Sequence, residues 1–230
     1  MFLHVVVAPL LLLASQQSSL SEDPMLGLTR ETILEMGFDW WFDYYCEEVG
    51  ASEMSMDIAT VTYAKCLDSR NATKLKALPR ARAKWIEDVE SAFREYRLGA
   101  VYSEMALAGG GTMYSHAAAR GRYDDEILSE NLVALSRSNR RKPSEVEQKE
   151  IARLTTSVRA YLSSLRADAK RKRPRDSWVR ADLLDEESAK AKAGFDRLCR
   201  LLEVAGPDDA MFTLRAADSW VAFGRGEGTR

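Results

Sequence analysis

Residues 79–107 read "PRARAKWIEDVESAFREYRLGAVYSEMAL", and the spacing of this stretch decides the fold class. Apolar residues recur in it at intervals of three and four, which is the period of an amphipathic helix. They are Ala81, Trp85, Val89, Ala92, Phe93, Tyr96 and Ala100. Pro79 suits the first position of a helix, and the glycines at 109–111 interrupt one. The stretch therefore predicts one long helix with a single buried face.

The same period continues on both sides of this stretch. It predicts helices over 29–48, 52–77, 124–136 and 144–170, one opened by Pro174 that fades near Gly206, and a last short one around Trp220. Thr29 is a candidate N-cap, and Ser144 with Glu147 forms a candidate capping box. We therefore expect an all-α fold, a bundle of about six helices with a C-terminal helical extension.

Six of the eleven residues in "FDWWFDYYCEE" (38–48) are aromatic. The residues at helical spacing are Leu34, Phe38, Trp41, Phe42 and Tyr45. Burying one aromatic side chain contributes on the order of 4–6 kcal/mol before entropy costs, so this face is predicted to be core. Trp40 and Tyr44 lie on its flank and are candidates for binding a partner.

The composition excludes several classes of function. A formal charge of -2 and a pI near 5.9 give no general attraction to nucleic acid or to an anionic membrane. A catalytic triad would depend on His116 once a leader containing His4 is removed, and a multi-histidine zinc site is excluded. The run Gly109–Thr112 lacks the lysine of a phosphate-binding loop. We expect no enzyme activity, no cofactor and no metal.

The N-terminus has the pattern of an export signal. It reads "MFLHVVVAPLLLLASQQSSLSED", with an apolar run from 5 to 14 followed by small residues, and Ser19 and Ser21 suit a cleavage site. The run is too short to span a bilayer. We therefore expect a signal peptide over 1–21 and a periplasmic or secreted protein. In such a compartment Cys46 and Cys66 could pair as a disulfide, and the alternative is that all three cysteines remain buried thiols.

The segment 46–135 resembles the LprI-like lysozyme-inhibitor family, a small helical domain of bacterial envelope proteins. The matching positions are Cys46, the pair Glu53 and Met54, Tyr63, Ala81 and Trp85, the run Gly110, Gly111 and Thr112, and the helix 128–135. The chain departs from the pattern where Asp57 stands at the second cysteine position. It also departs where two further family cysteines fall near Phe93 and Gly121, and where Asn131 replaces an arginine.

The resemblance implies a non-enzymatic envelope protein whose partner is lysozyme or another envelope protein. With the break that Pro143 marks and the glycine-containing end of the chain, we expect a helical domain at 22–142, a C-terminal helical region at 143–223 that could be a degenerate repeat, and a disordered tail at 224–230. The loop with Gly110, Gly111 and Thr112 joins Trp40 and Tyr44 as the expected contact surface. Two alternatives remain: an envelope hydrolase using paired carboxylates, and an intracellular interaction protein using the basic runs at 137–142 and 170–175.

Overall fold

The computed structural model describes residues 26–108, 113–135, 141–171 and 181–224, and these form eight helices without a strand. The helices are α2 (Arg30–Met36), α3 (Phe38–Val49), α4 (Glu53–Lys76), α5 (Arg80–Ala108), α6 (Met113–Ala134), α7 (Glu145–Arg171), α8 (Ala181–Leu202) and α9 (Pro207–Gly224). The all-α prediction is confirmed. The count of about six helices was too low for this part of the chain.

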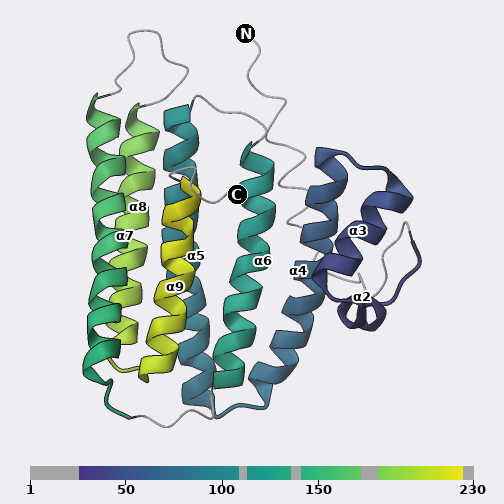
Figure 1. Cartoon of the computed structure of the whole chain (residues 1–230), viewed down its shortest axis with the longest axis horizontal. Coiled ribbons are helices and arrows are strands. Elements are labelled where there is room, and N and C mark those ends of the chain that lie inside the picture. The colour runs from purple at the N-terminus through teal and green to yellow at the C-terminus, as the bar shows by residue number, and fades with distance from the viewer. Residues whose placement is uncertain (1–25, 109–112, 136–140, 172–180, 225–230) are drawn as a thin grey trace.

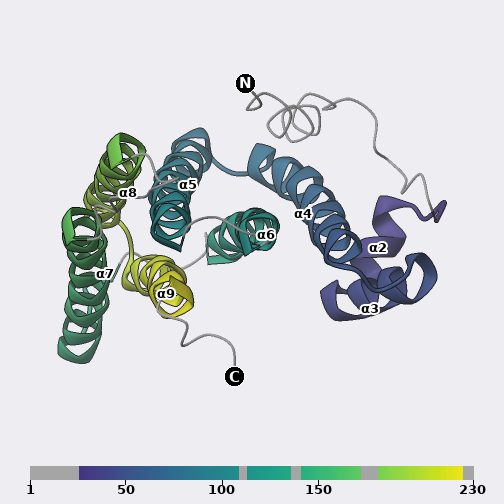
Figure 2. The same cartoon turned by 90° about the horizontal axis from the view of Figure 1, so that it is seen from above.

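The long helix predicted over 79–107 is α5, and it lies between α8 and α6 (Figures 1 and 2). It shares one core with α6, α7, α8 and α9. Its largest fully buried members are Tyr96, Phe93, Phe195, Ile86, Leu128, Leu132, Leu154 and Leu198. Five of the seven predicted apolar positions on α5 are buried, whereas Ala81 is exposed and Trp85 is half-buried at the start of the helix.

Helix α4 stands on the far side of α6, and α2 and α3 cover its outer face (Figure 2). This arrangement makes a second, smaller core from Ile33, Trp41, Tyr45, Ala59, Tyr63, Cys66 and Leu67. Tyr123 and Ile127 of α6 pack against it, so α6 separates the two cores and contributes to both.

Helices α5 and α8 approach each other closely, and each supplies a glycine to the contact. A Cβ atom built on Gly194 would lie 2.4 Å from the backbone nitrogen of Tyr96. A Cβ atom on Gly99 would lie 2.5 Å from the backbone nitrogen of Ala191. Real Cβ atoms do not approach backbone so closely, so the two helices can pack at this separation only because both positions lack a side chain.

The helix predicted over 29–48 is two helices. Thr29 caps the first as predicted, and its hydroxyl accepts a hydrogen bond from the Thr32 backbone N–H at 3.3 Å. Gly37 then has φ +79°, a left-handed conformation that ends α2, and the chain starts again as α3. The periodic spacing continued across Gly37 and concealed this break.

The other predicted boundaries are close to those of the structure. Ser52 caps α4 in a capping box with Ser55, and Ser144 and Glu147 form the predicted box at α7. Helix α6 begins at Met113, so it extends well before the segment 124–136 that was predicted to be part of a helix. The main core contains residues from both sides of the predicted domain boundary at 142, so α5 and α6 pack directly on the C-terminal helices.

Candidate functional site

The aromatic face of α3 faces inward as its spacing predicts. Trp41 and Tyr45 are fully buried, and the Trp41 indole N–H donates to the carbonyl oxygen of Ala59 at 2.8 Å. Phe38 is half-buried and stacks on Tyr123 of α6, with ring centroids 4.4 Å apart. These contacts attach α3 to α4 and α6.

The flank of α3 faces outward. Trp40 is 76% exposed and Tyr44 is half-buried. Two further apolar side chains are exposed at the start of the adjoining helix α4, Met54 at 71% and Ile58 at 40%. Among the described residues only five large hydrophobic side chains are exposed, and three of them lie in this α3–α4 hairpin, residues 38–58.

The hairpin and its surroundings are also strongly acidic. Residues 31–64 contain no lysine or arginine but eight carboxylates, Glu31, Glu35, Asp39, Asp43, Glu47, Glu48, Glu53 and Asp57. The rest of the chain has 33 Lys and Arg against 27 Asp and Glu, so the near-neutral total conceals a segregation of charge. Counting charges along the sequence would have found this signal, which the overall charge concealed.

The acidic side chains of α3 form no ion pair within the described part of the chain. Among the described residues no ion pair reaches Asp39, Asp43, Glu47 or Glu48, and none reaches Glu53 at the start of α4. Carboxylates of the bundle are commonly paired, for example Glu130 with Arg70 and Asp209 with Arg82. The hairpin therefore presents uncompensated negative charge around exposed apolar side chains.

The structure separates the positions that carry the family resemblance. Cys46 is half-buried on α3, Glu53 and Met54 are exposed at the start of α4, and Tyr63 is buried in the second core. Ala81 and Trp85 lie at the other end of the molecule, where α5 begins. Gly110, Gly111 and Thr112 lie outside the described residues, as do the predicted signal peptide and residues 225–230 of the tail.

Asp57 and Gly121, two of the departures from the family pattern, have specific structural roles. The Asp57 carboxylate contacts Nδ1 of His116 at 2.6 Å, which joins the first turns of α4 and α6. A Cβ atom on Gly121 would lie 1.8 Å from Nη1 of Arg97. A cysteine at 121 would therefore displace Arg97, whose side chain is 3% exposed.

The disulfide predicted between Cys46 and Cys66 is not formed in the structure. All three cysteines lie in described segments and none is in a disulfide, with Cys66 buried and Cys46 and Cys199 half-buried. Burial raises the pKa of the Cys199 thiol, and partial burial together with the nearby Asp43 carboxylate raises the pKa of Cys46. Both thiols are therefore less reactive than an exposed cysteine.

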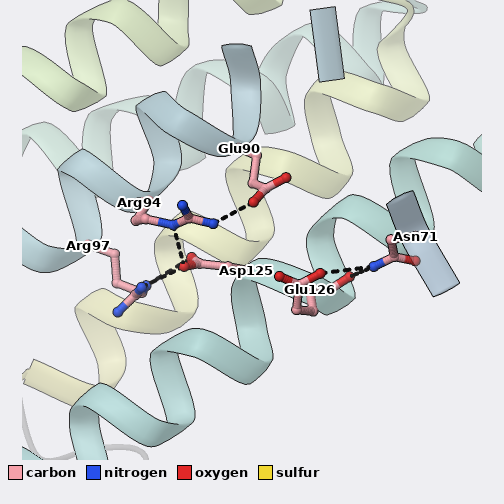
Figure 3. A network of polar contacts seen from close by, with 6 residues as sticks. All are labelled: Asn71, Glu90, Arg94, Arg97, Asp125 and Glu126. Atoms are coloured by element: carbon pink, nitrogen blue, oxygen red, sulfur yellow. Dashed lines mark hydrogen bonds and ion pairs between the residues drawn. The ribbon is translucent and has the colours of Figure 1, made fainter. Parts of the chain in front are cut away.

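A buried ion network that the sequence did not predict joins α5 and α6 (Figure 3). Arg97 donates to Asp125 through two nitrogens, with Nε–Oδ1 at 3.0 Å and Nη2–Oδ2 at 2.7 Å. Arg94 donates to the same carboxylate at 3.0 Å and also pairs with Glu90. Asp125 is 2% exposed, so its charge is balanced almost entirely by these two guanidinium groups.

A second carboxyl group beside this network, that of Glu126, has a raised pKa. The Asn71 amide donates to the backbone oxygen of Glu126 at 2.9 Å and to its carboxyl at 3.2 Å. Burial raises the pKa of Glu126 to about 8, and repulsion from Asp68 and Glu90 adds to the effect. Burial also raises the pKa of Glu90, against the opposing influence of Arg94. A neutral Glu126 lowers the cost of burying several carboxyl groups together.

The basic runs are only partly described. Residues 137–140 and 172–175 lie outside the described segments. Arg141 at the end of the first run pairs with Glu147 and with Asp208, at 3.3 Å from the latter, so it joins α7 to the start of α9. This contact gives Arg141 a structural role.

Within the described segments, no group of three His, Cys, Asp or Glu side chains is arranged to hold a metal ion. None of the described helices has the length and apolar composition needed to cross a bilayer. Comparison of the chain with protein-family models, with curated proteins and with solved structures found no match.

Proposed function

We propose that this protein is an exported, non-enzymatic binding protein whose α3–α4 hairpin docks on a basic protein, with lysozyme as the candidate partner. The observation that carries the proposal is the combination on the hairpin of exposed Trp40 with the α3 carboxylates, which no ion pair of the described residues reaches. Lysozyme as the partner, and export, rest on the sequence resemblance and on the signal-peptide pattern.

The two features of the hairpin suit different steps of binding. Uncompensated charge of one sign accelerates the encounter with a partner of the opposite sign and favours a defined orientation. An exposed tryptophan surrounded by polar groups is the kind of side chain that supplies much of the affinity once water is excluded. Helix α3 presents both, because its inward face attaches it to α4.

The test uses the mature chain, residues 22–230, with purified lysozymes of several structural types. We expect binding to a basic lysozyme that weakens as salt rises from 50 to 300 mM, and a matching loss of lysozyme activity. Succinylated lysozyme, in which the lysine charges are reversed, is the matched control and should not bind. Absence of both binding and inhibition across the whole set would refute the proposal.

Matched variants test the surface itself. Trp40→Ala should weaken binding about tenfold or more, as expected of a central aromatic contact. Val146→Ala, at a side chain 77% exposed on α7, is the control and should bind as the parent does. Asp43→Asn with Glu47→Gln should lower the association rate and the salt dependence. The same neutralisation at Asp185 and Glu203, which are exposed outside the hairpin, should change neither.

Export has its own measurement. The mass of the protein recovered from an expressing bacterium should match cleavage after residue 21. The protein should be recovered in the periplasmic fraction. An intact N-terminus in the cytosolic fraction would instead favour the intracellular interaction protein.

The raised pKa values of Glu126 and Glu90 favour a second candidate, a carboxylate hydrolase. Acid catalysis by a carboxyl that stays protonated at neutral pH is the chemistry this pair would supply. Hydrolysis of peptidoglycan or chitin fragments by the parent, lost in Glu126→Gln, would establish it. Both carboxyls are already engaged with Arg94 and Asn71, which favours the docking proposal.

A further inference from the structure

A pocket of about 420 Å³ opens where the chain turns at one end of the bundle, and it is separate from the α3–α4 hairpin. Leu78 and Pro79 of the α4–α5 turn and Val204 and Ala205 of the α8–α9 turn line the pocket. Ala81, Arg82 and Trp85 from the first turns of α5 line it as well. The volume is within the range of small-molecule sites, about 300–1,000 Å³.

The charged groups of the pocket are already paired with one another. Arg82 donates to both oxygens of Asp209 at 2.8 Å and also to the carbonyl oxygen of Leu132 at 2.8 Å. Its guanidinium carbon lies 4.5 Å from the centroid of the Trp85 ring. The Nε atom of Arg82 is buried and has no hydrogen-bond partner among the described residues. The pocket therefore has no net charge to attract an ion.

The indole nitrogen of Trp85 is also occupied, since it donates to the carbonyl oxygen of Leu201 at 3.0 Å. The other side chains that line the pocket are apolar, namely those of Leu78, Pro79, Ala81, Leu135, Val204 and Ala205. Val204 is 69% exposed, and it is one of only two large hydrophobic side chains that the described residues expose outside the hairpin region, together with Val146. An apolar side chain left in water at the wall of an apolar pocket gains free energy when a ligand covers it.

We infer that this pocket binds an uncharged, mainly apolar small molecule. The ligand packs against the apolar edge of Trp85 and between the two turns, and it covers Val204. A charged ligand is disfavoured because it would have to break the bidentate Arg82–Asp209 pair to find a partner. This site is independent of the proposed docking function, because the residues that form it lie on other elements.

The experiment uses the mature chain and N-phenyl-1-naphthylamine, an uncharged probe whose fluorescence rises in an apolar environment. We expect saturable binding at one site per chain, unaffected by salt between 50 and 300 mM because no charge is involved. Ala81→Trp, which fills the pocket, should weaken binding by about tenfold or more. Ala72→Trp, at an exposed position of α4 that does not line the pocket, is the matched control and should bind as the parent does.

Two further variants keep the inference open to refutation. Val204→Asp places a carboxylate at an exposed position of a turn, so folding is preserved, and it should also weaken binding. This variant decides the question if Ala81→Trp lowers the melting temperature. Trp40→Ala should leave probe binding unchanged. Non-saturable binding by the parent, binding insensitive to both pocket variants, or loss of binding in Trp40→Ala would each overturn the inference.

Discussion

Replacing Gly194 by alanine tests the packing of α5 against α8, because the geometry of this contact decides whether the substitution stabilises or destabilises the protein. On helix propensity alone, alanine is better than glycine by about 1 kcal/mol and would stabilise α8. The structure predicts the opposite, because the new Cβ atom would lie 2.4 Å from the Tyr96 nitrogen and 2.9 Å from the Glu95 carbonyl carbon. Both are backbone atoms of α5, so no side chain can rotate away.

The magnitude follows from the separation that relieves the clash. Ordinary contact begins at 3.4 Å, so the helices must move apart locally by about 1 Å. A gap of this size forfeits a quarter to a half of each dispersion contact nearby, and overpacking typically costs about 1–3 kcal/mol. We take the cost of this clash at the upper end of that range and subtract the gain of about 1 kcal/mol in helix propensity. The free energy of unfolding should then fall by about 2 kcal/mol. For a chain of this length that lowers the melting temperature by about 4–8 °C.

The assay is thermal and urea unfolding followed by circular dichroism. Ala193→Gly, at the exposed neighbouring position, measures the propensity term by itself and should cost about 1 kcal/mol. Gly99→Ala should destabilise in the same way, since its Cβ atom would meet the backbone of Ala191 and Glu187. The double variant should lose less than the sum, because one separation relieves both clashes. A melting temperature for Gly194→Ala that is unchanged or higher than that of the parent would refute the reasoning.

Three other predictions concern the buried polar groups and the thiols. Glu126→Gln should match the parent in stability near pH 4, where the carboxyl is protonated in both the folded and the unfolded states. Its free energy of unfolding should exceed that of the parent by an amount that grows as pH rises from the unfolded pKa of 4.5 to about 8. The reason is that the parent loses stability over this range, by up to about 1.4 kcal/mol for each unit by which the pKa is raised. Urea unfolding at pH 4, 6 and 8 measures this, and equal stability changes at all three values would contradict it. Asp125→Ala should cost about 3–5 kcal/mol in urea unfolding because it leaves Arg97 charged and buried, whereas Asp124→Ala, whose partner Arg120 is exposed, should cost less than half as much. Alkylation of the denatured, unreduced mature chain should add three labels, at Cys46, Cys66 and Cys199, as counted by mass spectrometry. A single label would show instead that two of the cysteines form a disulfide.

Much of this fold could be predicted from local signals in the sequence. The spacing of Val89, Phe93 and Tyr96 identified the central helix, and the caps at Thr29 and Ser144 identified two helix starts. These signals are local because a helix satisfies its backbone within itself and marks its buried face by period. The break at Gly37 was missed because a left-handed φ changes the chain direction without changing the spacing of the residues around it.

The contacts between helices could not be predicted in the same way. Gly99 and Gly194 are ordinary helix residues in the sequence, and only their placement opposite the backbone of the other helix makes them necessary. The network around Asp125 joins residues 28 and 31 positions apart, and the Arg82–Asp209 pair joins residues 127 apart. The sequence contains too many charged residues for such pairs to be selected without knowing which helices are neighbours. Trp40 and Trp85 were both singled out from the sequence, but their separation in space was not foreseen.

The acidity of the hairpin has two explanations, and its details favour one of them. Negative charge that serves only solubility would be mixed with positive charge, as it is in the i,i+4 pairs Arg120–Asp124 and Lys192–Asp196 of the bundle. Helix α3 carries four carboxylates with no cation, and repulsion among them opposes folding. The same helix exposes Trp40, although covering that ring would contribute several kcal/mol. Two unfavourable features concentrated on one short helix are accounted for together if a basic partner neutralises the charge and covers the tryptophan. If instead the charge served solubility alone, Asp43→Asn with Glu47→Gln would stabilise α3 and leave every binding measurement unchanged.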